Sequence, residues 1–259
     1  MAEAIEAPRF SSDLSGRVAL VTGTTSGLGK RFAHVLAQSG AKVVLTGRRV
    51  ERLEEVKAQI EGLGGTAIAL PLDMTDADNI KEVVDDAEAA FGTVDILINN
   101  AGIPDAQRAH KMEVDLIDRV IDTNLRGPYI LAAEVAKRLI AAEKPGRIVN
   151  IASVAAYRYD GNGAALYSIT KRAIARMSEA LAVEWARYNI NVNGIAPGAF
   201  MTEMLEGMLE RMGDFSKHFP RKRICTAEQM DSTLLFLLSP SSECVTGTVI
   251  TVDDGQGGR

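Results

Sequence analysis

The sequence predicts a single-domain α/β protein, built on a doubly wound parallel sheet of about seven strands with helices on both faces. Three observations support this prediction. The 259 residues suit one large domain, and short apolar runs alternate with helical patterns along almost the whole chain. The apolar runs are not interrupted by polar residues at every second position, which is typical of parallel strands that helices cover on both faces.

The strand and helix units follow one another in order. The run RVALVTG at 17–23 ends in a turn and precedes a helical pattern with Leu28, Phe32 and Val35. The same alternation predicts strands in KVVLTG, AIALPLD and DILINNAG, the last of them followed by a long helical region from about 112 to 142. RIVNIAS and NVNGIAPG are two further strands with a helix between them, and TLLFLL and TVITV close the pattern as helix and strand.

The domain organisation is simple. No linker rich in Pro, Gly or Ser divides the chain. We therefore expect a flexible N-terminal tail at 1–14 and one folded domain at 15–259.

Composition narrows the function. The formal net charge of -5 argues against a protein that binds nucleic acid. Cys225 and Cys244 are far apart, and His34, His110 and His218 are scattered, so neither a disulfide framework nor a metal site is predicted. No signal peptide and no apolar run of membrane-spanning length is present in this sequence, so we expect a soluble, cytoplasmic protein without a membrane partner.

A glycine-rich turn follows the first predicted strand. In VTGTTSGLGK, Gly23, Gly27 and Gly29 are spaced G-x-x-x-G-x-G, at the point where backbone N–H groups and a helix N-terminus favour an anion. A structural turn without a ligand is the alternative. The position after the first strand favours a phosphate-binding turn of a Rossmann-type domain, with Thr25, Ser26 and Leu28 as further contacts.

The end of the second predicted strand bears on which dinucleotide binds. An acidic residue there would hydrogen-bond the ribose of NAD, whereas arginine accommodates the extra phosphate of NADP. Here Gly47 is followed by Arg48 and Arg49. We therefore favour NADP(H), with Arg48 as the main contact, over NAD(H). The alternative is that both arginines are solvated residues at the start of a helix.

A tyrosine and a lysine share one helix face. In ALYSITKRAIARM, Tyr167 and Lys171 stand four positions apart, so their side chains are neighbours on a helix. If the pair occurred alone, the simpler interpretation would be that Tyr167 packs in the core and that Lys171 is exposed to solvent. The rest of the sequence decides between the two interpretations.

Six motifs occur in a familiar order: TGTTSGLG, NNAG at 99–102, Asn124 in DTNLRG, Ser153 in NIAS, YSITK, and APG at 196–198. In this respect the chain resembles the short-chain dehydrogenase/reductase family, in particular its NADP(H)-type members similar to 3-oxoacyl carrier-protein reductases. The resemblance extends over nearly the whole sequence. Ser153 and Tyr167 are slightly further apart than in most of the family, and VDDG stands where VDGG is more usual.

The resemblance implies roles for individual residues. Its catalytic set falls on Asn124, Ser153, Tyr167 and Lys171. The residues that it places around the cofactor, besides the glycine-rich turn and the arginines, are Asp73, Met74, Asn100, Ala101, Gly102, Tyr167, Lys171, Pro197, Gly198 and Thr202. It also implies a homotetramer or homodimer.

The implied chemistry is reversible hydride transfer between the nicotinamide and a carbonyl or secondary alcohol. Reduction leaves an alkoxide that needs a proton, so Tyr167 would be the general acid, and the base in oxidation. A cationic Lys171 is expected to lower the pKa of the tyrosine hydroxyl. Ser153 would hydrogen-bond the substrate oxygen, and Asn124 would either extend a proton relay or shape its helix.

The resemblance to the family implies that the segment at 199–222 forms a lid over the substrate. Its methionines and leucines recur at three- and four-residue intervals, which indicates an amphipathic helix with an adaptable apolar face. Ordinary core packing is the alternative for most of them. Such a face favours a bulky or apolar ketone, or a flexible range of carbonyl substrates.

Two other functions compete with an NADP(H)-dependent reductase. One is NAD-dependent oxidation of a polyol, hydroxy acid or other secondary alcohol. The other is a dinucleotide-sensing protein without turnover, which would have no need of the four catalytic residues together.

Overall fold

The sheet has the predicted architecture. The computed structural model describes residues 10–159, 161 and 163–257. Seven parallel strands are arranged in the order β3-β2-β1-β4-β5-β6-β7. Their bounds are β1 (Val18–Thr22), β2 (Lys42–Gly47), β3 (Thr66–Pro71), β4 (Ile96–Asn99), β5 (Gly146–Ile151), β6 (Ile190–Pro197) and β7 (Val249–Val252). The order reverses between β1 and β4, which is where open α/β sheets bind ligands.

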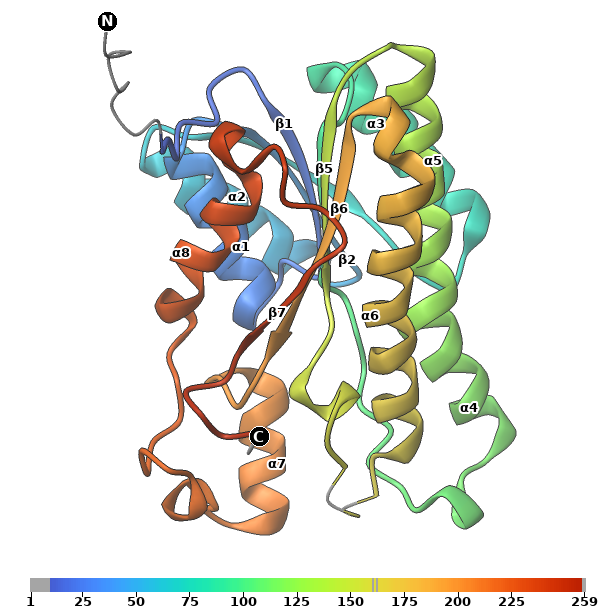
Figure 1. The fold of residues 1–259 in the computed structure, drawn as a ribbon, viewed down its shortest axis with the longest axis vertical. Coiled ribbons are helices and arrows are strands. Elements are labelled where there is room, and N and C mark those ends of the chain that lie inside the picture. The colour runs from blue at the N-terminus through green and yellow to red at the C-terminus, as the bar shows by residue number, and fades with distance from the viewer. Residues whose placement is uncertain (1–9, 160, 162, 258–259) are drawn as a thin grey trace, which may run out of the picture.

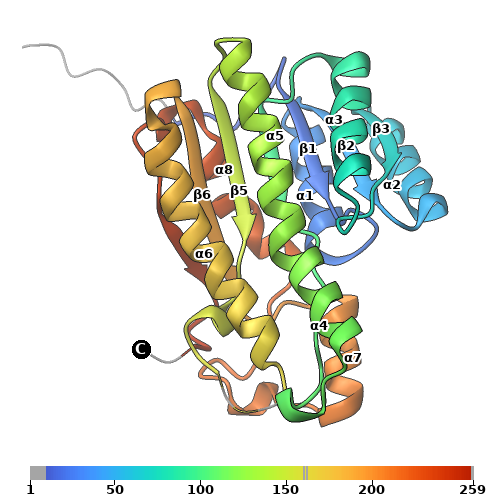
Figure 2. The same ribbon diagram turned by 90° about the vertical axis from the view of Figure 1, so that its right-hand side faces the viewer.

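Helices cover both faces of the sheet. The bounds are α1 (Gly27–Gln38), α2 (Val50–Gly62), α3 (Ala77–Phe91), α4 (Val114–Ile121), α5 (Gly127–Ala141), α6 (Ala165–Trp185), α7 (Glu203–Met212) and α8 (Asp231–Leu238). In Figure 1, α1, α2 and α8 lie on one side of the strands. Figure 2 shows α3, α5 and α6 side by side on the other face, with α7 beyond the sheet at the lower end. The prediction of a doubly wound sheet is confirmed.

Each face of the sheet has its own apolar core. Phe32 of α1, Leu53 of α2 and Leu234 of α8 are fully buried in one cluster. Leu131 of α5 and Val84 of α3 are fully buried in the other. Burying a side chain of this size contributes about 1.5–3 kcal/mol, so the two cores fix the sheet between its helix layers.

The long helical region predicted at about 112 to 142 is not one regular helix. A π-helical turn, Asp122–Arg126, separates α4 from α5. Gly127 follows it, and a Cβ there would stand 2.2 Å from the carbonyl oxygen of Met74. A π turn shifts the face on which later residues lie and is frequent at functional sites. Here it carries Asn124, which is buried beneath the carboxyl end of β4.

The N-terminal boundary lies before the predicted one. Residues 1–9 of the expected tail fall outside the described part of the chain. Leu14, the last residue of that tail, is buried in the core, and its N–H donates to the Ser39 carbonyl at 2.7 Å. The packed part of the chain therefore includes Leu14.

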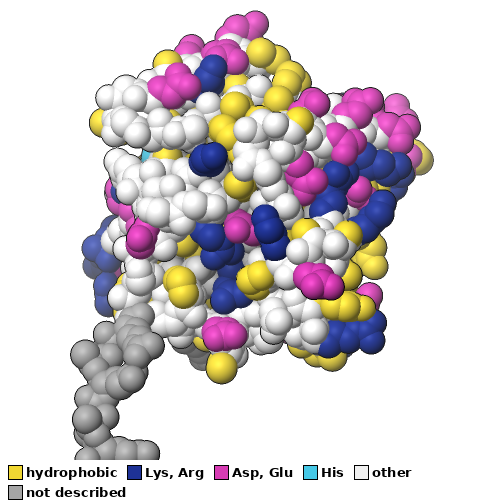
Figure 3. Space-filling model, turned by 90° about the horizontal axis from the view of Figure 1, so that it is seen from above, with side chains coloured by type: hydrophobic (Ala, Val, Ile, Leu, Met, Phe, Trp, Pro, Cys, Tyr) yellow, Lys and Arg dark blue, Asp and Glu magenta, His cyan; other side chains and the backbone are white. Residues whose placement is uncertain are grey.

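The amino ends of the strands form a face of mixed charge. Figure 3 shows this face from above, with acidic and basic side chains interspersed and hydrophobic ones scattered among them. Among the described residues, no helix has the length and apolar character that crossing a bilayer requires.

Candidate active site

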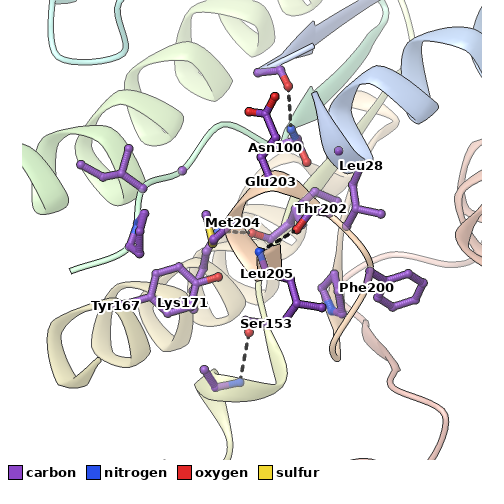
Figure 4. A pocket seen from close by; sticks show the side chains of 18 of the residues that line it. Leu28, Asn100, Ser153, Tyr167, Lys171, Phe200, Thr202, Glu203, Met204 and Leu205 are labelled. Atoms are coloured by element: carbon purple, nitrogen blue, oxygen red, sulfur yellow. Dashed lines mark hydrogen bonds between the residues drawn. The ribbon is translucent and has the colours of Figure 1, made fainter. Parts of the chain in front are cut away.

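A large cavity lies at the carboxyl ends of the strands. Its volume is about 1060 Å³, and its lining runs from the glycine-rich turn past the ends of β2, β4 and β5 to the first turn of α6. The segment that includes α7 closes the opposite side. Figure 4 shows Tyr167 and Lys171 beside each other on α6, with Ser153 near them and Thr202 to Leu205 across the cavity. The predicted site residues all line this one cavity except Asn124.

The glycine-rich turn fits a phosphate group. A Cβ at Gly29 would lie 2.2 Å from the Gly23 carbonyl oxygen, so only glycine lets α1 start this close to β1. Gly27 has a φ of +55° and begins α1, whose first N–H groups have no helical partner and lie at the cavity. This part of the cavity therefore suits the pyrophosphate of a dinucleotide.

The NNAG motif is tied to the same turn. The Asn100 side chain donates to the Thr22 carbonyl at 2.8 Å, and the Thr22 hydroxyl accepts the N–H groups of Asn100 and Ala101 at 2.9 Å each. A Cβ at Gly102 would stand 3.5 Å from the Lys171 ammonium. The motif thus forms a narrow wall between the glycine-rich turn and α6.

The arginines after β2 differ in their contacts. Arg48 is exposed, lines the cavity and makes no ion pair with any residue in the described part of the chain. Arg49 donates to the Thr25 hydroxyl at 2.6 Å and to Ser26 at 3.1 Å. Asp73, which follows the neighbouring strand β3, also lines the cavity. Hydrogen bonds from Thr75 lower the pKa of Asp73, and the charge of Arg48 adds to this. Arg48 is therefore the guanidinium available to an anion.

Tyr167 and Lys171 lie together as their spacing predicts. The Lys171 ammonium is 5.6 Å from the centre of the Tyr167 ring and donates to the Ile151 carbonyl at 2.7 Å. Lys171 is only 4% exposed, and burial lowers its pKa from 10.5 to about 8. Little solvent reaches this charge, which is held in place by the end of β5.

The pKa of Tyr167 differs from the sequence-based expectation. Tyr167 is partly accessible from the cavity, but protein atoms surround it, and burial raises its pKa above 10. A hydrogen bond with Ser153 acts in the opposite direction, and the charge of Asp105 raises the pKa further. The expected lowering by Lys171 does not prevail because desolvation disfavours the phenolate and the ammonium points to the Ile151 carbonyl. Burial therefore favours the protonated form of Tyr167.

Ser153 directly follows the end of β5 and opens a short turn. Its hydroxyl oxygen accepts the Ala155 N–H at 3.2 Å, which fixes its rotamer at the cavity wall. The same hydroxyl takes part in the hydrogen bond with Tyr167, so the two hydroxyl groups lie together at the cavity.

Asn124 lies behind the cavity wall, and its side chain hydrogen-bonds the backbone of the loop after β4. Its side-chain oxygen accepts the Ile103 N–H at 2.8 Å, and its amide donates to the Ile103 carbonyl at 2.9 Å. A weaker contact of 3.4 Å joins it to Thr170. Both polar groups of the Asn124 side chain are therefore engaged by the loop after β4.

The remaining predicted contacts come from the segments after β3 and β6. Met74 follows Asp73 at the cavity wall, and Pro197 and Gly198 line the cavity where β6 ends. The Thr202 hydroxyl accepts the Leu205 N–H at 3.2 Å and so caps α7 (Figure 4). A Cβ at Gly27 would stand 3.0 Å from the Thr202 methyl group, so the start of α7 lies against the glycine-rich turn.

The family follows from the whole chain. A family model described as short chain dehydrogenase matches residues 17–213. The chain belongs to the short-chain dehydrogenase family.

Relatives within this family differ in cofactor and substrate. The chain is similar to a 3-oxoacyl-acyl-carrier-protein reductase of Thermotoga maritima, at 36% identity with 93% of this chain and 98% of the relative covered. It is 34% identical to an NAD-dependent glycerol dehydrogenase of Listeria innocua, with 94% of each covered. A variant of actinorhodin polyketide ketoreductase solved with NADPH has a TM-score of 0.90 at 29% identity, covering 94% of this chain and 98% of that one. As a short-chain dehydrogenase, the protein is an oxidoreductase that acts on an alcohol or ketone.

One residue of this short-chain dehydrogenase that sequence reasoning missed is Asp105. Its buried carboxylate accepts the N–H groups of Leu166 and Tyr167 at 2.9 and 3.1 Å, and that of Ala106 at 2.9 Å. It therefore caps α6 from another part of the chain, next to the tyrosine. The only sequence signal was a lone acid shortly after NNAG.

Within the described residues, no three His, Cys, Asp or Glu side chains gather as a metal site would require. Cys225 is a buried free thiol and Cys244 an exposed one.

Proposed function

We propose that the protein transfers a hydride between NADP(H) and a carbonyl or secondary alcohol, with Tyr167 as the general acid and base. The observation that carries the proposal is the buried charge of Lys171 beside the Tyr167 ring, in a cavity that continues to the glycine-rich turn. Burying a lysine is costly, and such groups concentrate at functional sites. When bound, the dinucleotide supplies or accepts the hydride.

Each of the four proposed catalytic residues has its own role. Ser153 donates a hydrogen bond to the substrate oxygen, which stabilises the charge that develops there. Tyr167, whose protonated form is favoured because burial raises its pKa, gives its proton to that oxygen in reduction and takes it back in oxidation. Lys171 stabilises the phenolate that is left, and Asn124 fixes the loop at Ile103 that forms the wall beside them.

The cofactor would lie along the predicted contacts. The turn at Gly23, Gly27 and Gly29 would hold the pyrophosphate, and Arg48 and Asp73, which also line the cavity, would hold the adenosine end. NADP(H) is favoured because Arg48 lines the cavity with its guanidinium unpaired among the described residues. Asn100, Ala101 and Gly102 would line the adenosine side of the cofactor, and Pro197, Gly198 and Thr202 would contact the nicotinamide end.

The segment at 199–222 would serve as the lid. Met204, Met208 and Met212 of α7 line the cavity opposite the tyrosine, together with Phe215 and Phe219. These flexible and aromatic side chains favour a bulky or apolar carbonyl substrate.

We also propose a cytoplasmic homodimer or homotetramer. Ile169 and Val183 are large apolar residues on one face of α6, with exposed fractions of 63% and 81%. Such a face suits burial against a second copy. Light scattering of the purified protein tests the assembly, and a monomer at micromolar concentration would refute it.

The test of the function is a panel of ketones and secondary alcohols with both cofactors, followed by the absorbance of the reduced nicotinamide. Turnover with NADPH and a weaker response with NADH are expected. Arg48→Ala should weaken NADPH binding about tenfold or more and leave NADH binding almost unchanged. Unchanged NADPH binding would defeat the assignment of Arg48, and binding without turnover of any substrate would favour a sensor.

NAD-dependent oxidation of a polyol or another secondary alcohol is the second candidate. The likeness to an NAD-dependent glycerol dehydrogenase supports it. Faster turnover with NAD and glycerol or a sugar acid than with NADPH and any ketone would make it the better description.

A further inference from the structure

An ion-pair cluster joins the cofactor side of the cavity to α7. Glu203, the first residue of α7, lies 3.0 Å from a guanidinium nitrogen of Arg49, and its second carboxylate oxygen accepts a hydrogen bond from Arg52. Arg49 immediately precedes α2 and Arg52 lies in its first turn. One carboxylate from the proposed lid therefore binds two arginines that follow β2.

The same ion-pair cluster also contacts the glycine-rich turn. Arg49 donates to the hydroxyls of Thr25 and Ser26, and Thr202 lies against Gly27. Partial burial acts to raise the pKa of Glu203, but hydrogen bonds from Arg52 and Arg49 outweigh it and lower that pKa. Glu203 is therefore an anion at neutral pH, placed where the proposed cofactor would bring phosphate groups.

Glu203 also stands between two cavities. A second cavity of about 470 Å³, lined in part by Arg52 and Lys30, shares Glu203, Thr202 and the glycine-rich turn with the first. The two ion pairs form part of the partition between them. Displacement of the carboxylate would free Arg49, which lines the main cavity, and also Arg52, which lines the second cavity.

The charges predict different outcomes for the two dinucleotides. The 2′-phosphate of NADP(H) carries up to two negative charges and is attracted to Arg48, Arg49 and Arg52, but Glu203 repels it and already binds two of these arginines. NAD(H) lacks the 2′-phosphate, so Glu203 keeps its ion pairs with Arg49 and Arg52 when NAD(H) binds.

We propose that Glu203 is an internal competitor of the 2′-phosphate for Arg49 and Arg52, so that it limits the preference for NADP(H) over NAD(H) and links the choice of cofactor to the seating of α7. This inference rests on the proposed dinucleotide function. Glu203 is a specificity-determining residue in this proposal, and it takes no part in the proton transfer.

Calorimetric titration of wild type and Glu203→Gln with NADPH and NADH tests the proposal. The variant should bind NADPH about three- to tenfold more tightly, and its affinity for NADH should change less than about twofold. The expected gain is modest because exposed ion pairs have modest energies. Glu210→Gln is the matched control, because Glu210 is an exposed acid of α7 with no ion pair to any described residue. It should leave both affinities as in wild type.

Two adenosine fragments remove the nicotinamide from the comparison. Adenosine 2′,5′-bisphosphate should gain affinity in Glu203→Gln, and 5′-AMP should not. A second readout is hydrogen exchange of the Leu205 and Glu206 amides, which NADPH should speed relative to NADH in wild type but not in the variant.

The outcomes separate the two proposals. If wild type binds neither dinucleotide, both the function and this inference are overturned. If it binds both and Glu203→Gln changes the NADPH to NADH ratio no more than Glu210→Gln does, the inference alone is wrong.

Discussion

The carboxylate of Asp105 accepts the backbone N–H of Tyr167 at 3.1 Å, from a loop 62 residues earlier in the chain. The same oxygen accepts the N–H of Leu166, so one buried acid caps the helix that carries the proposed proton donor. Because a negative charge near a phenol disfavours the phenolate, Asp105 also raises the pKa of Tyr167. Asp105 thus positions the tyrosine and influences its ionisation.

Asp105→Asn is expected to make alcohol oxidation begin at lower pH. The amide keeps a cap acceptor but removes the charge, so the pKa of Tyr167 falls, while the hydrogen bond with Ser153 is retained. The check is the pH profile of kcat/KM for oxidation. An unchanged profile, or a shift to higher pH, would contradict the electrostatic role.

Asp105→Ala separates positioning from charge. Loss of the cap should cost about 1–2 kcal/mol of unfolding free energy and lower kcat at every pH, because the tyrosine is less well held. Urea unfolding and kcat measured on the same preparation check this. A stable variant with full kcat would show that the cap is not needed.

Lys171→Met is expected to stabilise the protein at pH 7 and abolish turnover. The folded-state pKa of about 8 lies below the unfolded value of 10.5, so the native state binds fewer protons between these values, and wild-type stability rises with pH in that window. Below pH 8 the buried charge costs up to about 3 kcal/mol, partly offset by its hydrogen bond to Ile151.

Urea unfolding of both proteins at pH 7 and pH 10 is the measurement. The advantage of Lys171→Met should be about 1–3 kcal/mol at pH 7 and should narrow at pH 10. A variant less stable than wild type at pH 7 would mean that Lys171 is stabilised by contacts stronger than those described.

Gly29→Ala is expected to impair dinucleotide binding and to destabilise the fold. The added Cβ would lie 2.2 Å from the Gly23 carbonyl, so the turn must move, at a cost on the order of 1–3 kcal/mol. Gly62→Ala is the control, because a Cβ at this last residue of α2 meets nothing within 4 Å and alanine favours helix. Equal effects of the two substitutions on cofactor affinity and melting temperature would contradict the role of the turn.

Much of the fold was predictable because it depends on local patterns. Apolar runs without alternation identified the parallel strands, and the glycine spacing placed the first turn at the cavity. Tyr167 and Lys171 were predictable as neighbours because helix geometry alone brings them together.

Other features depend on contacts between distant segments. Asp105 reaches α6, and Glu203 reaches Arg49 and Arg52, only because the sheet brings these loops to one end. The π turn at Asn124 is a small change in helical repeat that an apolar pattern does not reveal. The raised pKa of Tyr167 depends on its depth in the protein, which no motif encodes.

The most direct measurement is single-turnover reduction of a good ketone substrate by Tyr167→Phe with saturating cofactor. Tyr129→Phe, which alters an exposed tyrosine of α5, is the control. Removing the proton donor should slow hydride transfer by about a hundredfold or more, with cofactor affinity retained, and the control should match wild type. A Tyr167→Phe variant that reduces the ketone at the wild-type rate would contradict the proposed role of Tyr167.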